Sequence, residues 1–473
     1  MKQARLFING VWREGAGQFP VLDKYTGEQI ANAEIADADL VDQAVEAART
    51  AFRGGEIPLP DRYTLLMRAR DILMRRREEI LDALVAETGF TRDDNAGDFA
   101  RCEQTLLTSA EEAKRITGEM IPIAASPGHP GELAFTIRVP LGVVACITPF
   151  NSPLNTVAHK IAPALAAGNA VVLKPASYTP MAAVLLTEVF EEAGLPSGWL
   201  NLIHGPGSQT GRALCDNPDV AYFAFTGGGP AGAAIQAAAG MRRTQMELGN
   251  ISAAIVCEDA DLDRAAGKCI GTAFRKAGQV CTSLQRIYVA RSAIAEFTER
   301  FIARTAALVT GDPRDPATDI GPMVDAGEAA RAERMVTDSI AKGAQLRLGG
   351  ARDGALMAPT ILENVTPDMP VLSEEAFAPI VCLIPFDDFD AVIEAVNATP
   401  YGLSAGIFTR DIDRALTAAQ GIEVGLFNIN NTSSNRADPM PYGGCKASGW
   451  GREGPRAAIR DMTEERLITI TPG

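Results

Sequence analysis

Histidine is scarce in this chain, with three residues among 473. A metal centre built on imidazole ligands is therefore not expected. The eight cysteines lie at irregular spacing and form no Cys-x-x-Cys pair; their positions are 102, 146, 215, 257, 269, 281, 382 and 445. This usage is typical of reduced thiols rather than of a disulfide framework or a zinc site. We predict no metal cofactor.

Long apolar runs and an excess of positive charge are also missing. No apolar segment reaches the length that crosses a bilayer, and residues 1–13 lack the apolar stretch of a secretory signal. The formal net charge is -15, which argues against general binding to nucleic acid or to anionic membranes. We therefore expect a cytoplasmic protein with neither a nucleic-acid partner nor a membrane partner.

Apolar residues, at 47%, are ample for large buried cores, and the length predicts two or three domains. Residues 37–117 have a helical period, with Asp37 and Asp61 as the expected N-caps. From residue 143, short β-branched runs alternate with amphipathic helices. We expect strands at 143–147, 170–174, 199–203, 220–226 and 244–248, and helices at 154–167, 180–193, 207–215 and 231–239. This alternation predicts an α/β fold with a doubly wound parallel sheet, which binds ligands at the carboxyl ends of its strands.

A second αβ series follows residue 251. The expected strands are 253–256, 286–290, 380–385, 405–409 and 424–428, and the expected helices lie near 261–276, 292–309 and 326–342. We predict that this series forms a second domain with the catalytic residues.

Cys281 is the most informative single residue, because a carboxylate, Glu247, and an amide, Asn151, lie upstream of it. A thiolate can add to a carbonyl carbon, and a positioned amide can hold the oxyanion that develops. A carboxylate can then activate the water that releases the acyl group. Together the three residues predict oxidation of an aldehyde to an acid.

The stretches that contain these residues resemble the aldehyde dehydrogenase superfamily. They are residues 147–154, 168–176, 225–228, 374–379 and 441–444, and in order they span nearly the whole chain. The resemblance implies an NAD(P)-binding domain, 1–118 and 139–247, an α/β catalytic domain, 248–450, and a β arm, 119–138 and 451–473. The arm is expected to pair with another subunit in a homodimer or homotetramer, since its strands are otherwise unprotected edges.

The resemblance also implies roles in the reaction. Cys281 is the expected nucleophile, Asn151 and the Cys281 backbone amide are the oxyanion donors, and Glu247 activates water. Because the CoA-acylating branch lacks this glutamate, its presence favours a free acid as product. Cys281 follows a helix in a glycine turn, where a dipole and the cofactor's cationic ring are expected to lower the thiol pKa.

NAD or NADP is the implied cofactor. The helix after Gly228 is expected to carry the phosphates on free backbone N–H groups, and Gly228 replaces a serine that is common in the family. Ser177 stands where NAD-preferring members place a glutamate, so we expect NADP or dual use, with NAD preference as the alternative. The run 205–211 is a weaker signal, because its glycine spacing does not match a dinucleotide fingerprint. The expected cofactor contacts are Thr148, Pro149, Phe150, Lys174, Ala176, Ser177, Gly207, Gly211, Phe225, Thr226, Gly227, Gly228, Leu248, Gly249, Glu375 and Phe377.

Basic residues occupy four positions that line the substrate tunnel in the family. The predicted substrate contacts are Arg101, His159, Arg275, Arg436 and Thr282. Several buried cations without counter-charge are unfavourable, so they predict an anionic substrate group. Three alternatives stay open: Arg101 pairs with Asp98, Arg275 is a solvated helix end, or His159 is a core histidine.

Residues 435–441, which contain Arg436, resemble the branch that acts on small phosphorylated, phosphonated, sulfonated or hydroxy aldehydes. Phosphonoacetaldehyde is the first expected substrate, ahead of sulfolactaldehyde, sulfoacetaldehyde and glyceraldehyde 3-phosphate. A succinic-semialdehyde-type or a broad-specificity aldehyde dehydrogenase is the main alternative. A CoA-acylating enzyme and a non-catalytic structural or binding protein on the same fold are the others.

Overall fold

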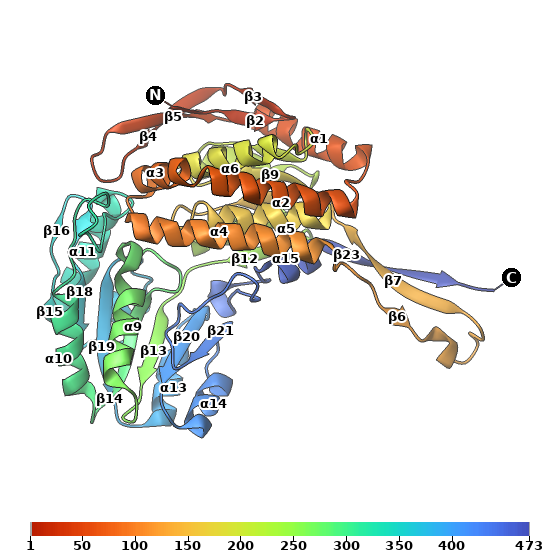
Figure 1. Ribbon diagram of the computed structural model, residues 1–473. Helices are drawn as coiled ribbons and strands as arrows, with labels where there is room; N and C mark the ends of the chain where they lie inside the picture. Colours follow the sequence, from red (N-terminus) through yellow and green to blue (C-terminus); the bar gives the residue numbers. More distant parts are fainter. Residues whose placement is uncertain (1, 473) are drawn as a thin grey trace.

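The computed structural model describes residues 2–472, which form two α/β bodies and a projecting β ribbon (Figure 1). A small sheet lies at the N-terminal end. It joins β1 (Lys2–Ala4), β5 (Gln29–Ile35) and β4 (Gly17–Leu22) in that order. None of the helices among residues 2–472 is long and apolar enough to cross a membrane.

Four helices follow, as the helical period of residues 37–117 predicts. They are α1 (Ala38–Gly54), α2 (Leu59–Arg75), α3 (Arg77–Thr88) and α4 (Arg92–Ala113). Asp37 caps α1, since its carboxylate accepts a hydrogen bond of 3.0 Å from the Leu40 N–H. The cap predicted at Asp61 is wrong. The chain enters α2 at Pro58, and Asp61 lies in the first turn, because Pro60 favours a helix start at that point.

The first large sheet contains all five predicted parallel strands, β8 (Val143–Ile147), β9 (Ala170–Lys174), β10 (Leu200–Leu202), β11 (Val220–Thr226) and β12 (Arg243–Glu247). Three short antiparallel strands, which the sequence analysis did not predict, extend its edges: β2 (Leu6–Ile8), β3 (Val11–Arg13) and β22 (Gly449–Trp450). The strand order is β22-β12-β11-β8-β9-β10-β2-β3, so the chain crosses over beside β8.

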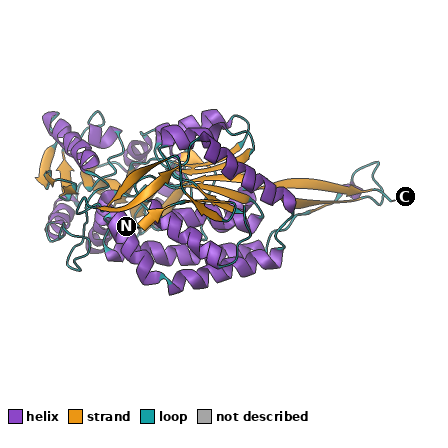
Figure 2. Cartoon of the chain, turned by 90° about the horizontal axis from the view of Figure 1, so that it is seen from above, coloured by secondary structure: helices purple, strands orange, loops and turns teal. Residues whose placement is uncertain are grey.

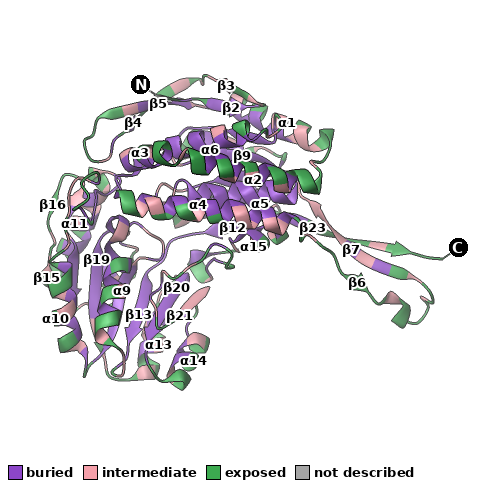
Figure 3. Ribbon diagram, in the orientation of Figure 1, coloured by how far each residue is buried: buried purple, intermediate pink, exposed green. Residues whose placement is uncertain are grey.

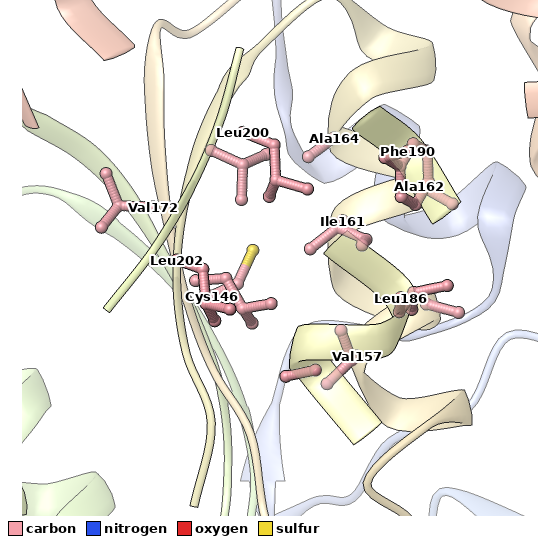
Figure 4. Packing of buried hydrophobic residues seen from close by; sticks show 14 of the residues in the cluster. Cys146, Val157, Ile161, Ala162, Ala164, Val172, Leu186, Phe190, Leu200 and Leu202 are labelled. Carbon is pink, nitrogen blue, oxygen red and sulfur yellow. The ribbon is translucent and has the colours of Figure 1, made fainter. Parts of the chain in front are cut away.

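Helices cover both faces of this sheet. They include α5 (Asn155–Ala167), α6 (Pro180–Glu192) and α8 (Gly229–Ala239). Figure 4 shows Ile161 of α5 between the sheet residue Cys146 and Leu186 of α6, and all three side chains are fully or almost fully buried. The helix predicted at 207–215 forms as a π-helical turn (Gly207–Gly211) followed by α7 (Arg212–Asp216).

The second sheet has the order β15-β18-β19-β14-β13-β20-β21. Its strands are β15 (Gln345–Leu348), β18 (Thr360–Glu363), β19 (Ile380–Phe386), β14 (Leu284–Ala290), β13 (Ser252–Val256), β20 (Ser404–Phe408) and β21 (Leu426–Ile429). Its helices are α9 (Leu262–Phe274), α10 (Ile294–Thr305), α11 (Ala326–Ala341), α12 (Pro370–Ser373), α13 (Phe389–Asn397) and α14 (Ile412–Gly421), and β16 (Arg352–Asp353) pairs with β17 (Leu356–Met357). The predicted strands of this domain all form; β15 and β18 were not predicted.

The ribbon extends away from both bodies (Figures 1 and 2). It consists of β6 (Met120–Ile121), β7 (Leu133–Pro140) and β23 (Thr463–Ile470), with β23 and β7 antiparallel along their whole length. Much of it is exposed (Figure 3), and its exposed apolar residues include Met120, Leu133 and Leu467. Residues 451–462, which the sequence analysis placed in the arm, contain α15 (Pro455–Asp461), and its Ala458 and Ile459 belong to the core of the first body.

Candidate active site

Cys281 lies in a tight turn between α9 and β14. Lys276, Ala277 and Gly278 all have positive φ angles, of 52°, 53° and 70°. A Cβ atom at Gly278 would lie 2.1 Å from the Ala378 carbonyl oxygen, so only glycine fits this position. The Gln279 side chain secures the turn by accepting from the Val324 N–H at 2.8 Å and donating to the Lys276 carbonyl at 3.1 Å.

The Cys281 thiol is held among protein groups that oppose its ionisation. Burial and the neighbouring Glu247 carboxylate raise its pKa well above the ordinary value, while a hydrogen bond to Tyr442 and the charge of Arg436 act in the other direction. The Tyr442 hydroxyl oxygen is 3.1 Å from Sγ. For the protein groups, burial and Glu247 have the larger effect, so a lower thiol pKa rests on the expected cationic ring of the cofactor.

Glu247 is the last residue of β12 and is buried. Its Oε1 atom has no hydrogen-bond partner in the part of the chain that the structure describes. Burial, together with the charge of Glu453, raises its pKa. An unpartnered carboxylate oxygen beside a thiol is suited to accept a proton from water or from the thiol.

Asn151 follows β8 and is attached to the turn that carries Cys281. Its Nδ2 donates to the Gln279 carbonyl at 2.8 Å, and its own carbonyl accepts from Lys276 Nζ at 2.9 Å. The structure therefore brings Asn151, Glu247 and Cys281 together, from the ends of two strands of one sheet and a loop of the other domain.

A second group of predicted residues follows β9. Lys174 is buried, and burial lowers its pKa to about 8. Its Nζ donates to the Pro175 carbonyl at 3.2 Å, and the Ser177 hydroxyl donates to the Gly205 carbonyl at 3.1 Å. A Cβ at Gly211 would lie 3.6 Å from Lys174 Cε. Ala176, which precedes Ser177 in the chain, is half-buried.

The N-terminus of α8 is open to a phosphate. No atom of residues 2–472 would contact a Cβ placed at Gly229, and Gly228 is the N-cap of the helix; a Cβ at Gly207, in the π-helical turn before α7, would likewise contact none of them. Gly227 is held against the Phe225 ring, which a Cβ would approach to 2.6 Å. Leu248 likewise packs on Gly232 within this helix. Free N–H groups and a helix dipole at this point fit a pyrophosphate.

Glu375 and Phe377 lie in the second domain, in the loop between α12 and β19. Glu375 accepts from the Asn250 N–H at 2.8 Å and closely approaches Gly249, and burial raises its pKa to about 7. The Phe377 ring meets Phe150 edge-on, with centroids 5.9 Å apart. Half-buried Pro149 separates Phe150 from Thr148, whose buried hydroxyl lacks a partner among residues 2–472. A carboxylate and a free hydroxyl here fit the second ribose of a dinucleotide.

One predicted cofactor residue points elsewhere. The Thr226 hydroxyl donates to Glu453 Oε1 at 3.1 Å, inside a buried ion-pair network. Lys160 Nζ is 3.1 Å from the same Glu453 oxygen. Glu453 was not among the predicted site residues, because its place in a Gly-Arg-Glu-Gly turn of the chain gives no signal that it reaches β11.

The cations predicted to lack counter-charge are mostly paired. Arg101 Nη2 is 2.9 Å and His159 Nε2 also 2.9 Å from Asp438 Oδ1. Arg436 Nη2 is 3.1 Å from Glu453 Oε2. This part of the expectation is wrong, because two carboxylates from distant loops neutralise the cluster. The alternative pairing of Arg101 with Asp98 is also wrong, since Asp98 accepts from Ser152 and from backbone N–H groups of α5.

These carboxylates are held ionised. Burial opposes ionisation of Asp438, but the hydrogen bond from His159 and the charge of Arg101 lower its pKa. Burial and the charge of Arg436 lower the pKa of His159. His159 is therefore a buried, hydrogen-bonded histidine, as one of the alternatives predicted.

Arg275 differs from the other cations. Its Nη2 donates to Ser434 Oγ at 2.5 Å, and Ser434 Oγ is 2.8 Å from Thr282 Oγ1. Ser434 therefore links the guanidinium to Thr282, the residue that follows Cys281. Among residues 2–472 it forms no ion pair, and Asp94 acts on its pKa only at longer range. Arg275 is half-buried and is not a solvated helix end.

The sequence model of the aldehyde dehydrogenase family matches residues 12–468. The chain belongs to the aldehyde dehydrogenase family. It is 47% identical over 470 residues to the 3-sulfolactaldehyde dehydrogenase of Priestia aryabhattai, an alignment that covers 99% of this chain and 98% of the relative.

Solved aldehyde dehydrogenases have the same fold. The NADP-dependent glyceraldehyde-3-phosphate dehydrogenase from Bacillus halodurans C-125, complexed with NADP, is 33% identical with a TM-score of 0.97, and the match covers 100% of both chains. Aldehyde dehydrogenase 21 from Physcomitrella patens, in complex with the reaction product succinate, is 35% identical with a TM-score of 0.97, covering 99% of this chain and 98% of that one. This aldehyde dehydrogenase is thus an NAD(P)-dependent oxidoreductase that acts on aldehydes.

Proposed function

We propose that this aldehyde dehydrogenase oxidises a short aldehyde with a distal oxyanion to the free acid, with 3-sulfolactaldehyde as the first candidate. The position of Arg275 carries the proposal. Its guanidinium is linked through Ser434 to Thr282 beside Cys281, and it forms no ion pair among residues 2–472. Guanidinium groups suit sulfonates and phosphonates because several N–H donors meet several oxygens.

The similar proteins help to rank the candidate substrates. The similarity to a 3-sulfolactaldehyde dehydrogenase supports ranking the sulfonate ahead of phosphonoacetaldehyde, which the sequence alone put first. Sulfoacetaldehyde and glyceraldehyde 3-phosphate follow. Succinic semialdehyde is the second candidate class, since a carboxylate also pairs with arginine and a solved relative is named as a complex with succinate.

In the proposed reaction, the Cys281 thiolate adds to the aldehyde carbon and forms a C–S bond. The Asn151 amide and the Cys281 backbone N–H bind the resulting oxyanion. NAD(P), when bound, would supply the hydride acceptor, and loss of the hydride from that carbon leaves a thioester on Cys281. Glu247 then removes a proton from water, and the hydroxide attacks the thioester and releases the acid and the Cys281 thiolate.

Replacing Arg275 with leucine should lower kcat/KM for 3-sulfolactaldehyde by about 10- to 100-fold, since hydrogen bonds to charged groups contribute roughly 1.5 to 3 kcal/mol. The kcat/KM for propionaldehyde, which carries no anionic group, should change by less than about threefold. The measurement is the initial rate of reduced-cofactor formation with 3-sulfolactaldehyde, phosphonoacetaldehyde, succinic semialdehyde and propionaldehyde.

Arg300→Leu is the matched control, because Arg300 is an exposed arginine on α10 that pairs with Glu296 and Asp263. Equal losses on charged and neutral aldehydes would remove Arg275 from the substrate site. Arg436→Leu is a less direct test of the same idea, because it also leaves the buried Glu453 without one of its partners.

We also propose that the enzyme accepts NADP. Ser177 is uncharged, its hydroxyl is bound to the Gly205 carbonyl, and Lys174 lies three residues before it. Ser177→Glu should lower kcat/KM with NADP by about 100-fold or more, because a carboxylate facing the 2′-phosphate costs several kcal/mol, and should leave NAD use within about threefold.

Ser177→Gln is the control for this change, since glutamine has the size of glutamate without its charge. If the glutamine variant loses NADP activity to the same extent, steric bulk rather than charge sets the preference, and the proposed basis for NADP use fails. Comparison of the NADP/NAD ratio of kcat/KM in the three proteins gives the answer.

We further propose that the ribbon of β6, β7 and β23 pairs with a second copy of the chain in a homodimer or homotetramer. Exposed apolar side chains on both of its long strands support this, among them Leu133, Leu467 and Ile470. A projecting sheet edge of this length is normally covered in a soluble protein.

A further inference from the structure

Tyr442 is buried directly beside the proposed nucleophile. It is 2% exposed, and its hydroxyl oxygen lies 3.1 Å from Cys281 Sγ. It lies in the 441–444 run, whose family resemblance assigned no role to the phenol. Cys281 Sγ is the only hydrogen-bond partner of this hydroxyl in the part of the chain that the structure describes.

The charges around this contact decide which atom donates. Burial and the neighbouring Cys281 and Glu247 raise the pKa of Tyr442 well above its ordinary value, so the phenol keeps its proton. Its proton therefore points to the sulfur whenever Cys281 is ionised. The Arg436 guanidinium lies 3.9 Å from the centre of the Tyr442 ring, where a cation draws electron density from the phenol.

The thiolate needs such a donor. Glu247 faces Cys281 and disfavours a second negative charge, whereas Arg436 and Arg275 act favourably but through longer distances. Arg436 is in turn occupied by Glu453. An anion buried without a hydrogen-bond donor is unstable. An ionised Glu247 can only accept a hydrogen bond, whereas the Tyr442 hydroxyl, 3.1 Å from Sγ, is placed to donate one.

We infer that Tyr442 is a catalytic residue whose hydroxyl donates a hydrogen bond to the Cys281 thiolate and so stabilises the ionised nucleophile. The thiol S–H bond breaks and its proton passes to bulk water, while the Tyr442 O–H bond stays intact. Glu247 keeps its charge, and the hydrogen bond from Tyr442 stabilises the new negative charge on Sγ. The inference rests on the proposed role of Cys281 as nucleophile.

Alkylation tests the inference without turnover. Purified wild-type enzyme and Tyr442→Phe, both without cofactor, are treated with iodoacetamide between pH 6 and 10, and modification of Cys281 is followed by peptide mass spectrometry. Removing the hydroxyl should raise the alkylation midpoint by about one to two pH units, and lower the rate at neutral pH by roughly 10- to 100-fold. Below both midpoints the ratio of the two rates should stay constant.

Tyr222→Phe is the matched control. Tyr222 is equally buried, but it lies in the core of the first body on β11. It should leave the midpoint unchanged. Incorporation of 3-fluorotyrosine at position 442 preserves the side-chain shape if the phenylalanine variant does not fold. Its more acidic phenol donates more strongly, so it should lower the midpoint.

Three results would overturn the inference. One is an unchanged alkylation midpoint in Tyr442→Phe or in the fluorotyrosine protein. Another is an equal slowing of alkylation in Tyr222→Phe, which indicates disturbed packing rather than lost stabilisation of the anion. The last is a wild-type Cys281 that resists alkylation up to pH 10; this result also removes Cys281 as nucleophile, whereas the first two leave that assignment intact.

Discussion

Glu247→Gln should form about one equivalent of reduced cofactor per active site and then nearly stop. Hydride transfer requires Cys281 and the oxyanion donors, whereas release of the acid requires a base for water. Glu247 is suited to be this base, because it is buried and its Oε1 has no hydrogen-bond partner in residues 2–472. Loss of a general base lowers a rate by roughly 100- to 10,000-fold, so steady-state turnover should fall by that factor.

The pH dependence should identify the same group. Burial and Glu453 raise the pKa of Glu247. Water activation needs the ionised form, so the rate of acid release is full above this raised pKa and declines as the pH falls through it. In Glu247→Gln the residual turnover should lose that acidic limb, while the first-turnover burst remains.

Stopped-flow absorbance of the reduced cofactor and mass spectrometry of the acyl-enzyme measure the two steps. Glu333→Gln is the control, because Glu333 is a surface residue of α11 paired with Arg352. It should turn over at the wild-type rate. A Glu247→Gln enzyme that shows no burst and no trapped acyl group would place Glu247 before hydride transfer and contradict the proposed order.

Most parallel strands of both domains were predictable because they are largely buried, so their residues form short β-branched runs between helices. The strands of the first sheet that escaped prediction are different. β2, β3 and β22 have two or three residues each, at sheet edges, and a run of that length has no period to detect. Their pairing is determined by the sheet they join rather than by their own sequence.

The central residues of the site were predictable for a related reason. Glu247 ends a strand, Asn151 follows one, and the carboxyl ends of parallel strands meet at one edge. The electrostatic environment of these residues was not predictable from the sequence. Asp438 lies 337 residues from Arg101 and 279 residues from His159 along the chain, and no local pattern indicates that these side chains meet. Basic residues at tunnel positions therefore predicted a net positive site where the structure has ion pairs.

Asn151→Ala should be the second severe variant, with kcat reduced by about 100- to 1000-fold, the usual effect of removing one oxyanion donor. Asn151 is 8% exposed and follows β8, so its side chain cannot be replaced by a nearby residue or by bulk water. The amide contributes when the oxyanion forms, more than when the aldehyde binds. We therefore expect KM to change by less than about threefold while kcat falls.

Asn151 also holds the turn of Cys281 through its 2.8 Å hydrogen bond to the Gln279 carbonyl, so a loss of activity has two explanations. Iodoacetamide alkylation of Cys281 separates them, since a displaced turn changes the alkylation rate and a missing oxyanion donor does not. Asn397→Ala is the control, because Asn397 also bonds backbone groups but lies at the end of α13, in the second domain. Wild-type alkylation with kcat lowered at least 100-fold assigns Asn151 to the oxyanion, and unimpaired turnover would remove it from the reaction.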